Sequence, residues 1–325
     1  MLPDLNTEND FVISTFFSWI NETVRKYGFD AIRIDTFRHV RPAFWKEYNQ
    51  IAGIYSIGEV ASEDTPYVAS YQNVADAVLH YPLFFTLIKV FKDDALTREG
   101  MTLLEIQVKS NQQHFKDTTV CGTFLDNHDQ DRFLNHTQNP IRIQNALTYL
   151  MFSDGIPILY MGMEQNLTGN PSERYGAGDP WNRDPMWRSG YNRLTWIYRY
   201  LTRLSQVRAF IKQQYADDFF VSTQKTIYVD QDIYVYQKGP VFMMIFNQRF
   251  PVSKIIPFDG TSHFNQLKDL LSNQTYQLNG NRELKIDDWS PLVLLPIPSS
   301  AILHQPCVTV SMILFLIRKR LQLDQ

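Results

Sequence analysis

Short β-branched segments alternate with helix-length segments along the first two thirds of the chain, and this alternation most constrains the fold. Strand-like runs lie at residues 29–35, 54–60, 74–79, 120–125 and 156–160. Apolar residues at helical spacing predict helices at residues 9–27, 41–52, 82–91, 103–115 and 141–152. This alternation is the pattern of βα units that build a parallel sheet, so we expect an α/β fold.

The pattern changes after a long helix expected at residues 196–211. Five short strand-like segments follow, separated by turns rich in Gly, Asp and Asn, at residues 219–222, 226–229, 233–237, 241–247 and 292–296. We therefore predict three regions: an α/β region over residues 1–216, an all-β domain over 217–300 and an atypical tail over 301–325.

Charge and hydropathy argue against two classes of partner. Lys and Arg number 31 and Asp and Glu number 34, and no basic stripe stands out, which argues against a nucleic-acid partner. The apolar run from Val308 to Ile317 is about ten residues, and a membrane helix needs roughly 20, so an atypical tail is favoured over a membrane anchor. Met1 begins a segment without the features of a secretory signal.

Cysteines and glycosylation sequons bear on the compartment. Cys121 and Cys307 lie far apart in sequence, which favours free thiols over a disulfide framework. The sequence carries four Asn-x-Thr sequons, and it leaves open whether any is used; they begin at Asn21, Asn135, Asn166 and Asn273.

Carboxylates fall at the ends of three of the predicted strands. Arg33 and Asp35 lie two residues apart, so they share a strand face, and Glu59 ends the next strand. Asp126 and Asp129 follow the strand at 120–125. Each cluster alone could be a salt bridge or a solvated loop entrance. Because catalytic groups of (β/α) barrels sit at the carboxyl ends of different strands, three carboxylates at equivalent ends favour an active site.

These segments resemble sequence signatures of the α-amylase family of glycoside hydrolases. The signatures are Gly28-Phe-Asp-Ala-Ile-Arg-Ile-Asp-Thr-Phe-Arg-His39, Gly58-Glu-Val60 and Phe124-Leu-Asp-Asn-His-Asp129, and Leu2-Pro-Asp-Leu-Asn6 resembles a fourth. The likeness covers roughly residues 1–300 and is nearest to secreted fungal-type α-amylases. It implies a (β/α)8 TIM barrel followed by a C-terminal antiparallel β-sandwich, and endo-hydrolysis of α-1,4-glucosidic bonds in starch or glycogen.

The resemblance implies a retaining double displacement by three carboxylates. Such a reaction needs a nucleophilic carboxylate and a carboxylic acid about 5 to 5.5 Å apart. Asp35 would be the nucleophile, and the neighbouring Arg33 cation would lower its pKa. Glu59 would protonate the leaving oxygen and then activate water. Asp129 would grip sugar hydroxyls and favour the distorted ring of the transition state.

The resemblance also implies substrate contacts. The substrate-binding residues would be Arg33, Arg38, His39, His128, Asp179 and Arg183. Tyr81 and Trp181 could stack on sugar rings or could pack in the core.

Calcium is the cofactor that the resemblance implies, and the chemistry requires no redox or nucleotide cofactor. Asp4 and the backbone carbonyl of His39 match two ligands of a structural calcium. Calcium takes six to eight oxygens, so two are too few. The expected partner is an α-1,4-glucan substrate, and the expected state is a monomer. The expected location of the parent enzyme is extracellular.

The sequence departs from the family pattern at its start. The family's first signature, Asp-x-x-x-Asn-His, is not matched, and the five predicted strands correspond to strands 4–8 of the barrel. An open five-stranded arc would leave unpaired edges, so we favour an incomplete product of a longer gene over a genuine five-stranded protein. Asp126 also stands where the family more often has Glu.

Three functional readings stay open. The first is an α-amylase, and the second is an α-glucosidase or transglycosylase that shares the same carboxylates. The third is a non-catalytic truncated paralogue that at most binds glucan, a reading motivated by the missing first signature.

Overall fold

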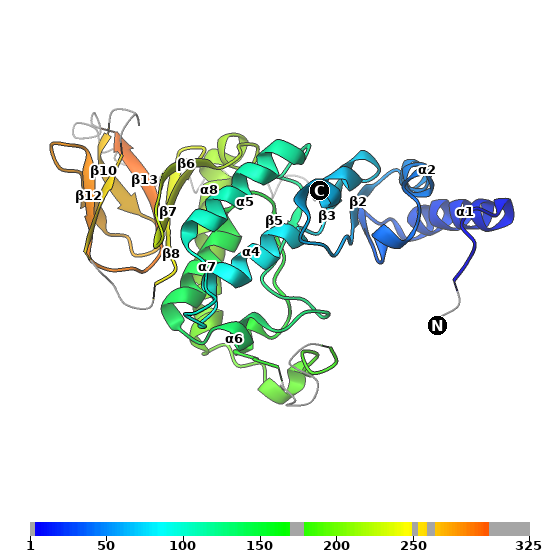
Figure 1. Ribbon diagram of the computed structural model, residues 1–325, viewed down its shortest axis with the longest axis horizontal. Helices are drawn as coiled ribbons and strands as arrows, with labels where there is room; N and C mark the ends of the chain where they lie inside the picture. The colour runs from blue at the N-terminus through cyan, green and yellow to red at the C-terminus, as the bar shows by residue number, and fades with distance from the viewer. Residues whose placement is uncertain (1–3, 170–178, 249–252, 259–263, 299–325) are drawn as a thin grey trace, which may run out of the picture.

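The computed structural model describes residues 4–169, 179–248, 253–258 and 264–298. Parallel strands with two flanking helices lie at one end of the molecule, packed helices lie in the middle, and antiparallel strands form the other end (Figure 1). The predicted order, an α/β region followed by antiparallel strands, is confirmed. The boundary placed at residue 216 stays a prediction, and the tail from residue 301 lies outside the described residues.

Five short parallel strands form the α/β part. They are β1 (Ala31–Ile34), β2 (Tyr55–Gly58), β3 (Ala77–Val78), β4 (Gly122–Thr123) and β5 (Ile156–Pro157). The first three form one sheet in that order, β4 pairs with β5, and a parallel bridge between Leu79 and Gly122 joins the two groups. The strands therefore lie side by side in chain order, and their carboxyl ends meet at one edge.

These strands are shorter than the sequence pattern predicts. Of the residues expected over 74–79, β3 comprises only Ala77 and Val78, and Leu79 adds the single bridge to Gly122. The Asp76 carboxylate accepts hydrogen bonds from the Ser56 backbone N–H at 2.8 Å and from its hydroxyl at 3.1 Å. The Asp76 side chain thus accepts from a backbone N–H of β2 that would bond to a backbone carbonyl if the two strands paired over a longer stretch.

Helices connect and cover the strands. The α-helices are α1 (Asp10–Tyr27), α2 (Pro42–Ala52), α3 (Thr65–Ser70), α4 (Tyr81–Phe91), α5 (Met101–His114), α6 (Phe133–His136), α7 (Pro140–Phe152) and α8 (Trp196–Phe219). Short 3₁₀ turns are η1 (Phe37–His39), η2 (Tyr71–Asn73), η3 (Met163–Gln165) and η4 (Met186–Ser189). Gly28 ends α1 in the left-handed conformation with φ of 64°, which agrees with the helix predicted at residues 9–27. The short helices α3 and α6 were not predicted.

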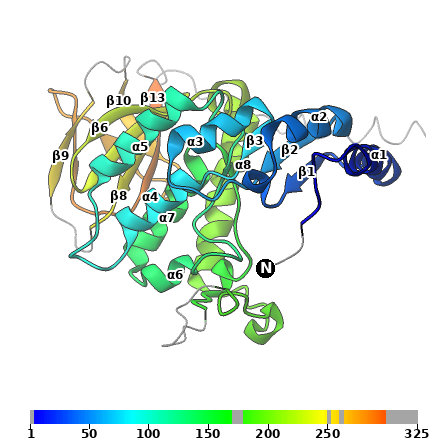
Figure 2. The same cartoon turned by 45° about the vertical axis from the view of Figure 1, so that its right-hand side comes forward.

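The antiparallel part has eight described strands. They are β6 (Lys225–Val229), β7 (Ile233–Lys238), β8 (Val241–Phe246), β9 (Lys254–Pro257), β10 (Phe264–Asp269), β11 (Thr275–Gln277), β12 (Glu283–Ile286) and β13 (Leu292–Pro298). Six form a sheet in the order β11-β10-β13-β8-β7-β6, and β9 pairs with β12. Phe242, Ile256 and Leu284 belong to one apolar core, so the two sheets pack face to face (Figure 2).

The strand predicted at residues 219–222 is wrong. Phe219 is the last residue of α8, and its ring packs edge-on against Phe152 of α7, with centroids 6.5 Å apart. Two adjacent aromatic residues suggested a strand, but tertiary packing keeps them at the end of the helix.

Helices α5 and α7 pack against the antiparallel sheet and join the two parts. Asn145 of α7 donates to the Trp289 carbonyl at 3.0 Å and accepts from the Phe246 N–H at 2.8 Å. Lys238 of β7 pairs with Asp154 at 3.0 Å, and both side chains are buried. No helix among the described residues is long and apolar enough to cross a membrane.

Cys121 is a buried free thiol, as predicted, and burial raises its pKa to about 12. Cys307 lies outside the described residues.

Candidate active site

The three carboxylates predicted from the sequence follow the carboxyl ends of parallel strands. Asp35 follows β1 and Glu59 follows β2, and the register pairs Ile34 with Gly58 immediately before them. The Glu59 N–H donates to the Ile34 carbonyl at 2.9 Å, so the two carboxylates are neighbours. Asp129 lies in the loop after β4.

Arg33 bridges the first two carboxylates. Its guanidinium donates to Asp35 Oδ1, and its Nη2 lies 3.5 Å from Glu59 Oε2. The hydrogen bond from Arg33 lowers the pKa of Asp35, burial opposes this shift, and a hydrogen bond with Glu59 adds to the lowering. The Asp35 side chain is 65% exposed and that of Glu59 only 13%. The site thus presents an ionised, accessible Asp35 beside a sheltered Glu59.

Glu59 is held at both of its oxygens. Oε2 accepts from the Thr36 N–H at 3.1 Å, and Oε1 accepts from the Tyr81 hydroxyl at 3.2 Å. Two donors on opposite oxygens fix the plane of the carboxyl group.

Of the two roles that the sequence leaves open for Tyr81, the structure supports core packing. Its side chain is 1% exposed, because the first turn of α4 points the ring into a cluster with Phe84 and Phe124. Only the hydroxyl reaches the site. Trp181 is partly buried, and its stacking role stays a prediction.

Three of the predicted substrate-binding residues gather around Asp129. Arg183 Nη2 donates to Asp129 Oδ1 at 3.0 Å, and Arg183 Nε lies 2.7 Å from Asp179 Oδ1. His128 Nε2 lies 3.2 Å from Asp129 Oδ2. A cation and an imidazole therefore contact different oxygens of one carboxylate, which leaves Asp129 in a fixed orientation.

Two asparagines that the sequence reasoning missed shape this loop. Asn127 Oδ1 accepts from the N–H groups of Asp129 at 2.9 Å and Gln130 at 3.0 Å. Asn182 Nδ2 donates to the carbonyls of Asn127 at 3.2 Å and Gln130 at 2.5 Å. Both asparagines are sequence neighbours of predicted site residues, His128 and Arg183, and that adjacency is the signal that could have found them.

Asp126 lies beneath this loop. It is buried and accepts from the Phe133 N–H at 3.1 Å. Burial raises its pKa to about 7, while the Phe133 N–H and the Arg132 cation oppose the shift. Asp126 therefore supports the loop from within and does not face the site.

Arg38 and His39 lie in η1, directly after the Asp35 segment. Arg38 Nη1 donates to the Ala61 carbonyl at 2.6 Å, and Arg38 Nε donates to His39 Nε2 at 3.3 Å. Both side chains are exposed. Arg38 therefore links the loops that follow β1 and β2.

The predicted calcium ligands do not form a complete site. Members of the family generally bind calcium. Asp4 is exposed ahead of α1, and within the described part of the chain no three His, Cys, Asp or Glu side chains are grouped to hold a metal. Asp4 and the His39 carbonyl are by themselves too few for calcium, which takes six to eight oxygens.

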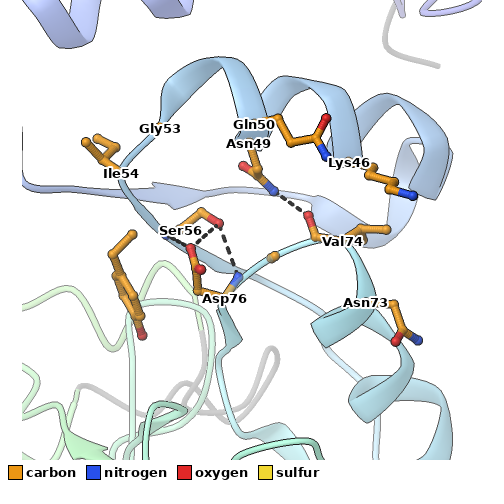
Figure 3. A pocket seen from close by; sticks show the side chains of 11 residues that line it. Lys46, Asn49, Gln50, Gly53, Ile54, Ser56, Asn73, Val74 and Asp76 are labelled. Carbon is orange, nitrogen blue, oxygen red and sulfur yellow. Dashed lines mark hydrogen bonds between the residues drawn. The ribbon is translucent and has the colours of Figure 1, made fainter.

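A separate hollow of about 590 Å³ lies at the opposite, amino-terminal ends of β2 and β3 (Figure 3). Ser56 and Asp76 line it, and they bond to each other. Asn49 donates to the Val74 carbonyl at 2.6 Å. These polar groups hold the ends of the strands together, so we assign no chemistry to the hollow.

Known proteins match this chain over most of its length. The family model described as "Alpha amylase, catalytic domain" matches residues 1–231. An α-amylase of Saccharomycopsis fibuligera is 30% identical over 91% of this chain and 58% of its own, and alpha-amylase 1 of Lipomyces kononenkoae is 36% identical over 69% and 34%. The solved structure of an α-amylase from Malbranchea cinnamomea superposes with a TM-score of 0.82 at 30% identity, covering 91% of this chain and 62% of that one.

The chain spans about half the length or less of most of the curated relatives it matches, from 23% to 58%. Its structural neighbours have a (β/α)8 barrel and a C-terminal antiparallel sheet, which agrees with the predicted fold class. The family model covers well over half of this chain and includes all three strand-end carboxylates. The chain therefore belongs to the α-amylase family.

Proposed function

We propose that this chain carries the catalytic centre of a retaining α-amylase that hydrolyses internal α-1,4-glucosidic bonds of starch-type glucans. The observation that carries the proposal is the placement of Asp35 and Glu59 at adjacent strand ends, bridged by Arg33. The α-amylases among its relatives support the same activity.

In the first half of the reaction Asp35 attacks the anomeric carbon while Glu59 gives its proton to the glycosidic oxygen. The carbon–oxygen bond breaks, the shortened glucan leaves as an alcohol, and a glycosyl ester forms on Asp35. In the second half Glu59 takes a proton from water, the water oxygen attacks the anomeric carbon, and the Asp35 carboxylate is released. The low pKa and the exposure of Asp35 suit a nucleophile.

The remaining predicted residues would bind the sugar. Asp129, oriented by Arg183 and His128, would accept hydrogen bonds from sugar hydroxyls and favour the positively charged transition state. Arg38 and His39 would line the side next to Asp35, and Asp179 would act with Arg183.

Finer features of the complete protein belong to the same proposal. The five parallel strands would correspond to strands 4–8 of the barrel. Asp4 and the His39 carbonyl would supply two of the oxygens of a structural calcium, and no catalytic step passes through that metal. We also propose an extracellular, monomeric parent enzyme. The four sequon asparagines are exposed, which is compatible with glycosylation.

The substitution Asp35→Asn tests the proposal. It keeps the shape of the side chain and removes the nucleophile, so the rate of starch hydrolysis should fall at least about 10³-fold. The control is Asp30→Asn, an exposed residue just before β1, which should leave the rate unchanged. Hydrolysis that survives Asp35→Asn would contradict the assignment.

The products separate the related functions. A spread of oligosaccharides from soluble starch supports endo-hydrolysis, whereas glucose alone indicates an α-glucosidase and longer chains indicate transglycosylation. If the unsubstituted chain produces no sugar, the non-catalytic reading is favoured.

A further inference from the structure

We propose that Tyr81 and Asn127 form a one-way hydrogen-bond relay that positions Glu59 and reserves its Oε1 as an acceptor. The relay runs from the backbone of the Asp129 loop through Asn127 and Tyr81 to Glu59. The inference rests on the proposed function, because it assigns Tyr81 and Asn127 as positioning residues for that reaction.

The direction of the relay is set at Asn127. Its Oδ1 accepts from two backbone N–H groups, those of Asp129 at 2.9 Å and Gln130 at 3.0 Å. Because backbone N–H groups only donate, the atom that faces them must be the oxygen. The other end of the amide is therefore the NH₂ group, and it donates to the Tyr81 hydroxyl at 3.1 Å.

The direction continues through Tyr81. A phenol has one proton, and Asn127 donates to its oxygen, so the proton of Tyr81 points to Glu59 Oε1 at 3.2 Å. Rings of Phe84 and Phe124 hold the phenol in place, with centroids 6.0 and 5.1 Å from that of Tyr81. Burial raises the pKa of Tyr81, so its proton stays on the hydroxyl.

The consequence concerns the orientation of the Glu59 carboxyl group. Oε1 accepts from the Tyr81 hydroxyl, and Oε2 accepts from the Thr36 N–H, so the group is held from two sides. Oε2 is the oxygen that faces Thr36 and lies 3.5 Å from Arg33, next to Asp35. The relay thus couples the orientation of Glu59, beside Asp35, to the loop that carries Asp129.

Two substitutions break the relay in different ways. Tyr81→Phe removes the donor to Glu59. Asn127→Asp keeps an oxygen for the two backbone N–H groups but turns the NH₂ donor into an acceptor, so the Tyr81 proton is drawn away from Glu59. Both variants should lower kcat on soluble starch about tenfold with little change in KM, a part of the roughly 10²- to 10⁴-fold that general acid–base catalysis contributes.

A substrate that needs neither acid nor base separates positioning from a merely structural role. Fluoride leaves α-maltosyl fluoride without protonation, and azide attacks the glycosyl ester without a base. With this substrate and azide, both variants should turn over within about twofold of the unsubstituted chain. The matched control is Tyr149→Phe, which removes a buried hydroxyl that accepts from Gln224 at 3.1 Å and that contacts none of the proposed catalytic residues through a hydrogen bond. It should lower the Tm like Tyr81→Phe and leave kcat on starch unchanged.

The outcomes are distinct. If Tyr81→Phe slows starch and the fluoride–azide reaction equally, or slows neither, the relay is overturned while the proposed function stands. If the unsubstituted chain cleaves neither substrate, or if Asp35→Asn leaves starch hydrolysis intact, the proposed function fails and the relay falls with it.

Discussion

Strands β1 and β8 show how differently the two parts of the molecule are built. All six residues of β8 are buried, and it is hydrogen-bonded to β7 and β13 on its two edges. Only Ile34 of β1 is buried, and among the described strands β1 pairs with β2 alone. The nucleophile candidate Asp35 thus follows the less buried of the two strands in this chain, and its orientation depends on polar contacts with Arg33 and Glu59.

The two parts also differ in how they surround a buried carboxylate with hydrogen-bond donors. Asp269, the last residue of β10, accepts from the Leu271, Ser272 and Val293 N–H groups and from the Ser272 hydroxyl. Asp126, under the Asp129 loop, accepts from the Phe133 N–H. The antiparallel part surrounds its buried charge with donors, whereas the part that carries the site leaves one carboxylate poorly solvated.

We expect the largest effect on the free energy of unfolding when one phenylalanine from each part is replaced by alanine. Phe242 of β8 is buried and packs against Phe258 and Phe264, so Phe242→Ala should lower the free energy of unfolding by about 3–5 kcal/mol. Phe16 of α1 also contacts two rings, of Trp19 and Phe44, but is partly exposed, and Phe16→Ala should cost about 1–2 kcal/mol. Urea unfolding of both variants measures the gap, and equal losses would contradict the contrast between the two parts.

A smaller, pH-dependent effect should separate the two buried carboxylates. Burial raises the pKa of Asp126 from its ordinary value of 3.8 to about 7 in the folded chain, so its contribution to stability is full below about pH 4 and is lost as the pH rises through 7. Asp126→Asn keeps an acceptor for Phe133 and removes this loss. The variant should be about 2–4 kcal/mol more stable than the unsubstituted chain at pH 8 and close to it at pH 4.

The matched substitution in the antiparallel part should act in the opposite direction. Asp269→Asn turns one oxygen into a donor that faces other donors, so it should lower the Tm at pH 8. Thermal unfolding of both variants between pH 4 and 8 provides the measurement. A higher Tm for Asp269→Asn, or a lower Tm for Asp126→Asn at pH 8, would contradict the difference that we infer between the two buried carboxylates.

Much of the site could be predicted from local sequence, because strand ends place side chains by simple geometry. Arg33 and Asp35 share a face at the end of β1, and Glu59 follows the next strand. The role of Tyr81 could not be predicted in this way. Whether an aromatic ring stacks on a sugar or lies in the core depends on the direction in which α4 leaves the sheet, and that direction is set by contacts with Phe84 and Phe124.

The helices and strands also differ in how far local sequence predicts them. Strong apolar runs predicted β7, β8 and β13, because their residues are almost all apolar or buried. β9 and β12 are four residues each and carry lysines, so their stability comes from pairing with each other, which local sequence does not reveal. The long helix α8 outlasts its predicted end at residue 211, because Phe219 gains a buried position beside Phe152.

The smallest expected effect compares two helix caps of identical chemistry. Asn9 accepts from the N–H groups of Phe11 at 3.0 Å and Val12 at 3.3 Å, and Asn139 accepts from Ile141 and Arg142 at the same two distances. Each cap stabilises its helix by about 1 kcal/mol. In α7 most residues are buried, so fraying of its first turn disturbs the core, whereas Ile20 is the only buried residue of α1.

Asn139→Ala should therefore lower the global free energy of unfolding by about 1 kcal/mol, and Asn9→Ala by less than about 0.5 kcal/mol. In the Asn9 variant the loss should appear as faster hydrogen exchange at the amides of Phe11 and Val12, because the first turn of α1 opens without unfolding the rest. Equal global losses would mean that α1 is as firmly integrated as α7. In that case the end of the molecule that carries Asp35 would be more exposed than the antiparallel part without being less firmly packed.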